Sequence, residues 1–168
     1  MFKTPQEAAM PEVETGESHI HYDKDKPEEP DAIPIGLATQ EVVDLFEQFA
    51  TALTAGDGEK VAELWDVPAF ILGDKMEMVV EDLDEISEYM GKGKGHYNQR
   101  GIIDTRGDIV HLHWIGEKIA LVEVRWPYLN EGGEEIGAET STYTLRRDDD
   151  GNLKVRIAVM HGVETEAH

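Results

Sequence analysis

The chain of 168 residues contains no cysteine. Disulfide bonds, thiolate catalysis and cysteine-ligated zinc or iron–sulfur sites are therefore excluded. No apolar run approaches the roughly 18 residues that a membrane-spanning helix needs. The N-terminus lacks the basic start and apolar run of a secretory signal. These absences favour a cytoplasmic protein that is held together by packing alone and has no membrane partner.

Basic residues are scarce, with 15 lysines and arginines against 36 aspartates and glutamates and a formal net charge of −21. A surface this acidic repels nucleic-acid phosphates and anionic lipid headgroups, both of which bind to basic patches. We therefore expect no nucleic-acid partner. The acidity fits a highly soluble protein, and composition leaves open whether it reflects a saline habitat.

Residues 1–38 are rich in acidic residues, lysine and proline and poor in periodic apolar residues. This composition predicts an N-terminal extension without a packed core of its own. His19 and His21, followed by Asp23, have spacing that occurs in metal sites, but in an acidic tail we interpret the pair as incidental. We expect one domain over residues 39–162 and a short tail at 163–168.

Apolar residues recur at helical spacing from residue 39, and Thr39 and Gly56 are suited to cap and end a helix there. Asp57 can open a short second helix. Asp82 and Glu85 resemble a capping box that opens a third helix. The glycine-rich "GKGKG" at 91–95 that follows is interpreted as a flexible loop.

Two short strands, 69–72 and 76–80, are expected before the third helix. After Tyr97 the alternation of apolar residues and the intervening turns "GE", "NEGG" and "DDDGN" predict a long antiparallel sheet. Three helices followed by four long strands indicate an α+β domain with helices on one face of the sheet. The four strands are expected at residues 102–115, 118–129, 135–147 and 153–162.

The stretch "VRWPYLNEGGEEIGAETSTYTLRRDDDGNLKVRIA", residues 124–158, is the clearest local match to a known family. It resembles the C-terminal hairpins of uncharacterised SnoaL-like members of the nuclear transport factor 2-like superfamily, over roughly residues 39–162. The resemblance implies a cystatin-like cone: a curved antiparallel sheet whose concave face is covered by three N-terminal helices and encloses a pocket. The catalytic patterns of ketosteroid isomerase and scytalone dehydratase, which share this fold, are absent from the sequence.

The strand register follows from requiring one apolar face, because a slip of one residue turns a strand over. Pairing Ile115 with Ile119 turns His111 and His113 to the outer face, with Glu123 opposite His111. Two histidines and a carboxylate are the types of side chain that bind iron or zinc. A metal site formed by His111, His113 and Glu123 is therefore the alternative interpretation. The neighbouring outer residues instead favour a homodimer through this face. The residues that motivate the dimer are Leu121, Thr142, Ala158 and Met160.

The inner face carries one polar exception to its apolar pattern. Pairing Leu129 with Glu134 and Arg147 with Leu153 brings Glu139 opposite His161 on adjacent strands. A carboxylate that orients an imidazole makes a general base, and Tyr143 would donate to a developing oxyanion. The alternative is that Glu139 and His161 sit at a strand end and only satisfy each other.

The remaining candidates line the expected pocket, where packing and ligand recognition overlap. They predict binding of a small apolar or aromatic molecule without a cofactor. A small lyase or isomerase that uses Glu139 and His161 is the alternative, and a dimerisation scaffold with a filled cone is a further one. The predicted pocket residues are Trp65, Phe70, Tyr89, Trp114, Trp126 and Ser141.

Overall fold

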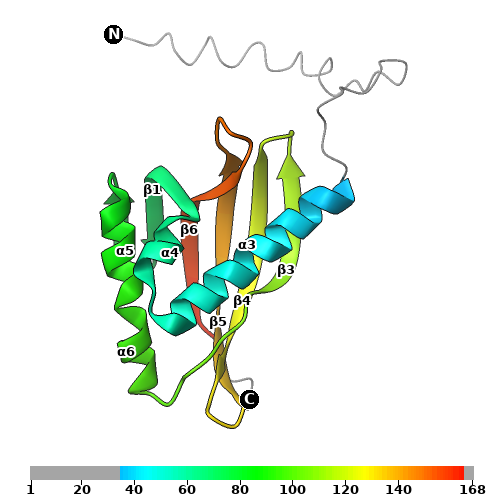
Figure 1. Cartoon of the computed structure of the whole chain (residues 1–168). Helices are drawn as coiled ribbons and strands as arrows, with labels where there is room; N and C mark the ends of the chain where they lie inside the picture. The colour runs from blue at the N-terminus through cyan, green and yellow to red at the C-terminus, as the bar shows by residue number, and fades with distance from the viewer. Residues whose placement is uncertain (1–34, 165–168) are drawn as a thin grey trace, which may run out of the picture. The chain divides into compact units, whose positions relative to one another are not determined.

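A six-stranded sheet and a layer of helices make up this computed structural model, which describes residues 35–164 (Figure 1). The sheet has the strand order β2-β1-β6-β5-β4-β3. All neighbouring strands are antiparallel except β1 and β6, which run parallel. The strands are β1 Trp65–Gly73, β2 Met76–Val80, β3 Asp108–Ile115, β4 Ile119–Leu129, β5 Glu135–Arg147 and β6 Leu153–Val163. The helices are α3 Ile35–Ala55, α4 Gly58–Ala62, α5 Leu83–Gly91 and α6 Gly93–Asn98.

The predicted α+β class is confirmed, and helix α3 crosses one face of the sheet diagonally (Figure 1). This helix begins at Ile35, so the predicted start and cap at Thr39 are wrong. The small and apolar residues before Thr39 extend the helix, and Ala38 packs into the buried side. Gly56 ends the helix as predicted, with a φ of 72° that glycine adopts without strain.

The predicted starts of the next two helices are confirmed. The Asp57 side chain accepts a hydrogen bond from the Lys60 amide at 3.1 Å, and the Asp82 side chain accepts one from the Asp84 amide at 2.8 Å. Helices α4 and α5 touch closely at Gly58, where a Cβ would lie 2.0 Å from the Ser87 carbonyl oxygen. Glycine at this position therefore lets α5 dock on α4.

The predicted loop over "GKGKG" is wrong, because its second half belongs to helix α6. Helix α6 is short, contains two glycines and has no fully buried residue. Glycine lowers helix stability by roughly 1 kcal/mol per residue relative to alanine. Contacts of individual side chains therefore hold α6 in place. The helix propensity of its residues does not predict these contacts.

The core lies between α3 and the inner face of β4 and β5. Phe46 and Phe49 pack on Trp126 and Tyr143, with ring centroids between 5.0 and 6.2 Å apart. The Trp126 Nε1 donates to the Tyr143 hydroxyl at 3.0 Å, so the buried indole N–H is satisfied. Within residues 35–164, no helix is both long enough and apolar enough to cross a membrane.

The strand register agrees with the prediction at the first hairpin and departs from it later. Ile119 faces Ile115, and Glu123 faces His111, as predicted. Leu129 pairs with Glu135 instead of Glu134, and an irregularity between Tyr128 and Leu129 makes the shift two residues from Tyr128 onward. A shift of two residues leaves the β5 side chains beyond this point on their predicted face.

The last strand differs more, because β6 contains two irregularities, at Arg156 and His161. Each inserts one extra residue and shifts the register by one. After the first shift, Ala158 and Met160 lie on the inner face. The prediction that these two residues lie on the outer face is therefore wrong. After the second shift, Glu139 faces Val163 and not His161.

Candidate functional site

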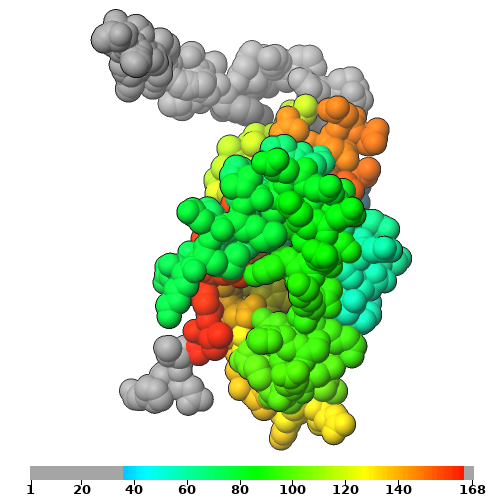
Figure 2. Space-filling model, turned by 90° about the vertical axis from the view of Figure 1, so that its left-hand side faces the viewer, coloured from blue at the N-terminus to red at the C-terminus, as the bar shows by residue number. Residues whose placement is uncertain are grey.

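A cavity of about 460 Å³ lies between the inner face of the sheet and the helices α5 and α6. Figure 2 shows a hollow bordered by the green α5–α6 segment and the red end of β6, with orange and yellow atoms of the sheet inside it. Helix α3 contributes Phe49 and Leu53 to one wall, and β6 contributes Ala158 and Met160 to another. The lining is largely apolar, which is typical of sites for small molecules.

Tyrosine is concentrated around this cavity. The sequence has five tyrosines, and four of them line the cavity. Phe49 and Trp126 add two further aromatic rings to the same wall. Aromatic side chains give a large apolar contact area, and the tyrosine hydroxyl adds a hydrogen-bonding group at its end. The four tyrosines are Tyr89, Tyr97, Tyr128 and Tyr143.

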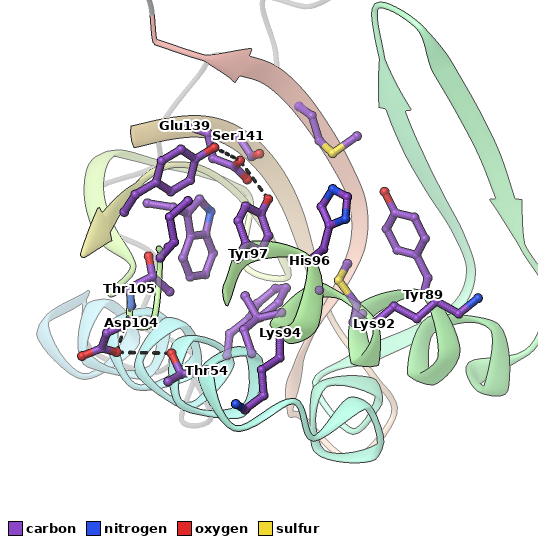
Figure 3. Close-up of a pocket in the computed structure, with 18 of the residues that line it drawn as sticks. Thr54, Tyr89, Lys92, Lys94, His96, Tyr97, Asp104, Thr105, Glu139 and Ser141 are labelled. Carbon is purple, nitrogen blue, oxygen red and sulfur yellow. Dashed lines mark hydrogen bonds between the residues drawn. The ribbon is translucent and has the colours of Figure 1, made fainter. Parts of the chain in front are cut away.

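Glu139 is the half-buried carboxylate of the cavity, and two tyrosines hold it. Its Oε1 accepts hydrogen bonds from the Tyr97 hydroxyl at 3.1 Å and from the Tyr128 hydroxyl at 2.5 Å. Figure 3 shows this contact and the hollow beside it. Tyr97 belongs to α6 and Tyr128 to β4, so the carboxylate of β5 joins the helix to the sheet.

A cation lies behind the two tyrosine rings. The Arg100 guanidinium carbon is 5.5 Å from the centroid of the Tyr97 ring and 5.4 Å from that of Tyr128. Arg100 does not line the cavity. It stabilises the tyrosine cluster by cation–π contact. Among residues 35–164, no basic side chain forms an ion pair with Glu139.

The tyrosine hydroxyls stay protonated well above neutral pH. Burial, and then the negative charge of Glu139, raise the pKa of Tyr89 and Tyr97. Burial is also the main cause that raises the pKa of Tyr128 and Tyr143. All four phenols therefore keep their hydrogen, which Tyr97 and Tyr128 donate to Glu139 and Tyr89 donates to the Met76 sulfur. The Tyr143 oxygen accepts from Trp126, which leaves its own hydrogen free to donate.

A second group of polar side chains lies at a different edge of the cavity. The Thr54 hydroxyl donates to Asp104 Oδ1 at 3.2 Å, and the Thr105 hydroxyl donates to the Pro127 carbonyl at 2.7 Å. In Figure 3, Asp104 and Thr54 lie apart from Glu139. The basic residues Lys92, Lys94 and His96 line the cavity from the α5–α6 segment.

Five of the nine predicted catalytic and pocket residues line this cavity. They are Glu139, Tyr143, Tyr89, Trp126 and Ser141, of which Ser141 is only 3% exposed.

The other predicted pocket residues lie elsewhere. Trp65 is 1% exposed and belongs to the core, and Phe70 is 40% exposed on the outer face, where it pairs with Val79 and Ile157. Trp114 packs against the Arg147 guanidinium at 5.6 Å. The prediction that Trp65, Phe70 and Trp114 line the pocket is therefore wrong. Alternation identified the inner face of the long strands, but not which part of that face the helices leave uncovered.

The predicted pair of Glu139 and His161 is not formed. His161 is exposed, and its Nε2 lies 2.8 Å from the Thr142 hydroxyl on the outer face. The extra residue at Arg156 brings Met160 to the inner face, so the next residue, His161, points away from the cavity. Glu139 therefore keeps tyrosines, and not an imidazole, as its hydrogen-bond partners.

The alternative metal site is not assembled either. His111 and His113 are exposed on β3, with Glu123 opposite the first of them as predicted. Over the part of the chain that the structure describes, no three histidine, aspartate or glutamate side chains are grouped to hold a metal ion. The pair His19 and His21 lies outside the described residues.

Tyr128 and Tyr97 contribute most to the site beyond the predicted set. Tyr128 follows Trp126 by two residues, so alternation along β4 could have placed it on the inner face. Tyr97 is not among the predicted pocket residues, because the glycines before it hid helix α6. No local pattern links Tyr97 to Glu139, which is 42 residues further along the chain.

A sheet covered by helices around a hollow inner face defines the cone-shaped, nuclear transport factor 2-like class. The family model described as "NTF2-like protein (DUF6841)" matches residues 40–163. The chain belongs to this family. A search of curated proteins finds no significant match.

Solved structures with the same fold share little sequence with this chain. A domain of unknown function with a cystatin-like fold from Nostoc punctiforme has a TM-score of 0.64 and 15% identity, covering 79% of this chain and 81% of its own. A ketosteroid isomerase-like protein from Erwinia carotovora atroseptica has a TM-score of 0.58 and 16% identity, with coverage of 80% and 100%. A putative calcium/calmodulin dependent protein kinase II association domain from Xanthomonas campestris has a TM-score of 0.56 and 18% identity, with coverage of 88% and 99%. At these identities the likeness shows the fold alone.

Proposed function

We propose that the cavity beneath α5 and α6 binds a small apolar or aromatic molecule. The observation that carries this proposal is an aromatic hollow of about 460 Å³ around one half-buried carboxylate. A volume of this size fits small ligands, and a few convergent polar groups in an apolar lining orient them. A filled cone, as a pure dimerisation scaffold would have, does not account for this hollow.

Titration of the isotope-labelled chain with phenethyl alcohol, followed by NMR, tests the proposal. The expected amide shifts cluster at residues that line the cavity. Ser141→Leu places a larger side chain in the cavity and should abolish them. Thr140→Leu adds the same bulk on the opposite face of the strand and serves as the matched control. Shifts that survive in Ser141→Leu would contradict the proposal.

A small cofactor-independent lyase or isomerase is the second candidate. Glu139 Oε2 takes no hydrogen bond from the protein among residues 35–164, and the Tyr143 hydroxyl has a hydrogen free to donate. A carboxylate base and a phenol donor suit proton abstraction beside a carbonyl group. Exchange of acidic hydrogens of small ketones with deuterated water tests this function. Loss of exchange in Glu139→Gln would support it, and equal exchange in wild type and variant would contradict it.

We also propose a homodimer through the outer face of the sheet. A row of paired residues crosses this face from Val79 through Phe70, Ile157 and Thr144 to Leu121. Val79 and Phe70 are exposed apolar side chains on a surface that water would otherwise cover. Light scattering should give twice the chain mass. Leu121→Arg would bring like charges together across a two-fold axis and should produce the monomer; a monomeric wild type would contradict the dimer.

A further inference from the structure

The two oxygens of the Glu139 carboxylate have unequal partners. Oε1 accepts from both Tyr97 and Tyr128, whereas Oε2 accepts from no protein group among the described residues. Each carboxylate oxygen has lone pairs for about two donors. Glu139 is half-buried, and a carboxylate with reduced contact to water gains from a donor at each oxygen. Oε2 is therefore the acceptor that Glu139 can offer to a ligand.

The surroundings of Glu139 determine what can bind at this oxygen. The two hydrogen bonds at Oε1 and the Arg100 guanidinium behind the tyrosine rings stabilise the carboxylate and hold it in one orientation. Burial is the main cause that raises the pKa of Tyr89 and Tyr143, and the negative charge of Glu139 adds to it in both, so this charge acts across the cavity. An anionic group close to Glu139 would be repelled, whereas a hydrogen-bond donor would be attracted.

We propose that the molecule bound in this cavity carries a hydroxyl or ammonium group on an apolar or aromatic body, and that this group donates a hydrogen bond to Glu139 Oε2. The inference rests on the proposed function, because it requires the cavity to bind a small molecule. The apolar body would lie against Phe49 and Trp126. Neutral alcohols and protonated amines share the donor chemistry, and their comparison shows which of the two the site prefers.

The lysines of the α5–α6 segment give the opposite expectation. Lys92 and Lys94 line the cavity and would attract a carboxylate ligand. Neither forms an ion pair with Glu139 among residues 35–164. The two lysines would favour an anionic ligand, whereas Glu139 would favour a hydrogen-bond donor. Measured binding of an anionic and of a donor ligand therefore distinguishes the two possibilities.

Four probes with the same aromatic ring test the inference: phenethylamine, phenethyl alcohol, ethylbenzene and phenylacetate. Binding to the full chain is measured by NMR titration. We expect phenethylamine, phenethyl alcohol or both to bind about tenfold or more tightly than ethylbenzene and phenylacetate, because a hydrogen bond to a charged group is among the stronger ones. Preference for the amine alone would assign a cationic ligand, and equal binding of amine and alcohol a neutral donor; both outcomes support the inference.

Glu139→Gln is the decisive variant, since it keeps the size of the side chain and an oxygen for Tyr97 and Tyr128 but replaces Oε2 by a donor. It should abolish the preference of the site for phenethylamine and phenethyl alcohol over ethylbenzene. Glu131→Gln, at an exposed turn, is the matched control. The carboxyl carbon NMR resonance of Glu139 in the wild type gives a readout that needs no variant. It should shift with the donor probes and stay in place with ethylbenzene.

The outcomes separate this inference from the proposed function. Equal binding of ethylbenzene and the donor probes, or tighter binding of phenylacetate, would overturn the donor ligand while leaving a binding cavity. A preference that persists in Glu139→Gln would also overturn it. Binding of none of the four probes would count against the cavity as a binding site and therefore against both.

Discussion

The inner face of the sheet has two regions that the helices cover in different ways. Under α3, the side chains of Val42, Leu45 and Phe46 fill the space, and none of the three lines the cavity. Under α6, which has no fully buried residue, the space is a cavity, and the contact to the sheet is a hydrogen bond from Tyr97 to Glu139. The difference separates residues that stabilise the fold from residues that are free to recognise a ligand.

The largest effect is expected in the filled region. Phe46→Ala should lower the free energy of unfolding by about 3–5 kcal/mol, because it removes a fully buried ring that does not line the cavity. Denaturant unfolding measures this loss. Tyr89→Phe, which removes only a hydroxyl at the cavity, should change stability by much less. Similar losses in both variants would remove the distinction between the two regions.

Alkaline pH should destabilise the cavity region in particular. The pKa of Tyr97, Tyr128 and Tyr143 is raised in the folded chain, whereas that of an unfolded tyrosine is close to 10.0. Their contribution to stability is therefore complete below about pH 10 and is lost as the pH rises above it, by about 1.4 kcal/mol per pH unit for each tyrosine.

Unfolding by denaturant at a series of alkaline pH values measures this slope. Tyr128→Phe should reduce the slope of unfolding free energy against pH by the contribution of one tyrosine. Tyrosines that ionise in the folded chain at the same pH as in the unfolded chain, seen by ultraviolet absorbance, would contradict the prediction.

The two tyrosines that donate to Glu139 should respond differently to removal of the hydroxyl. Each loss should cost about 1 kcal/mol of stability, the usual value of one hydrogen bond. Tyr97→Phe should also release α6 and speed hydrogen exchange of its amides. Tyr128→Phe leaves the Tyr97 contact in place and should not. Equal exchange in the two variants would show that the Tyr97 contact does not hold the helix.

The smallest effect is expected for a glycine of α6. Gly95→Ala meets no atom within 4 Å and should stabilise this helix by about 0.5–1 kcal/mol. Hydrogen exchange of the α6 amides should slow by roughly two- to fivefold. Gly101→Ala is the control, since its φ of 83° strains any other residue and should make the change unfavourable. Faster exchange in Gly95→Ala would contradict this account of α6.

The fold was largely predictable from the sequence because apolar residues alternate along most of its long strands. Ile115 and Ile119 flank a short turn, which leaves one register that keeps the apolar residues together. The capping aspartates Asp57 and Asp82 marked two helix starts for a similar local reason. In each case the deciding interaction lies within a few residues along the chain.

The candidate site was predictable only in part, because its geometry depends on irregularities without a local pattern. Arg156 and His161 look like ordinary strand residues, yet each is an extra residue in the pairing of β5 with β6. The insertion at Arg156 brings Met160 to the cavity and His161 to the outer face, and the insertion at His161 makes Val163 the partner of Glu139. Tyr97 was hidden by a glycine-rich stretch, and only its long-range bond to Glu139 explains its position.

The central claim is that the region under α5 and α6 binds a small molecule, whereas the region around Val42, Leu45 and Phe46 of α3 is solid core. An NMR titration of the wild-type chain with phenethylamine tests this most directly, with the amides of both regions assigned. The account predicts shifts at Tyr97, Ser141 and Met160 and no shift at Val42 or Leu45 of α3. Shifts spread over both regions, or none up to the solubility limit of the probe, would contradict it.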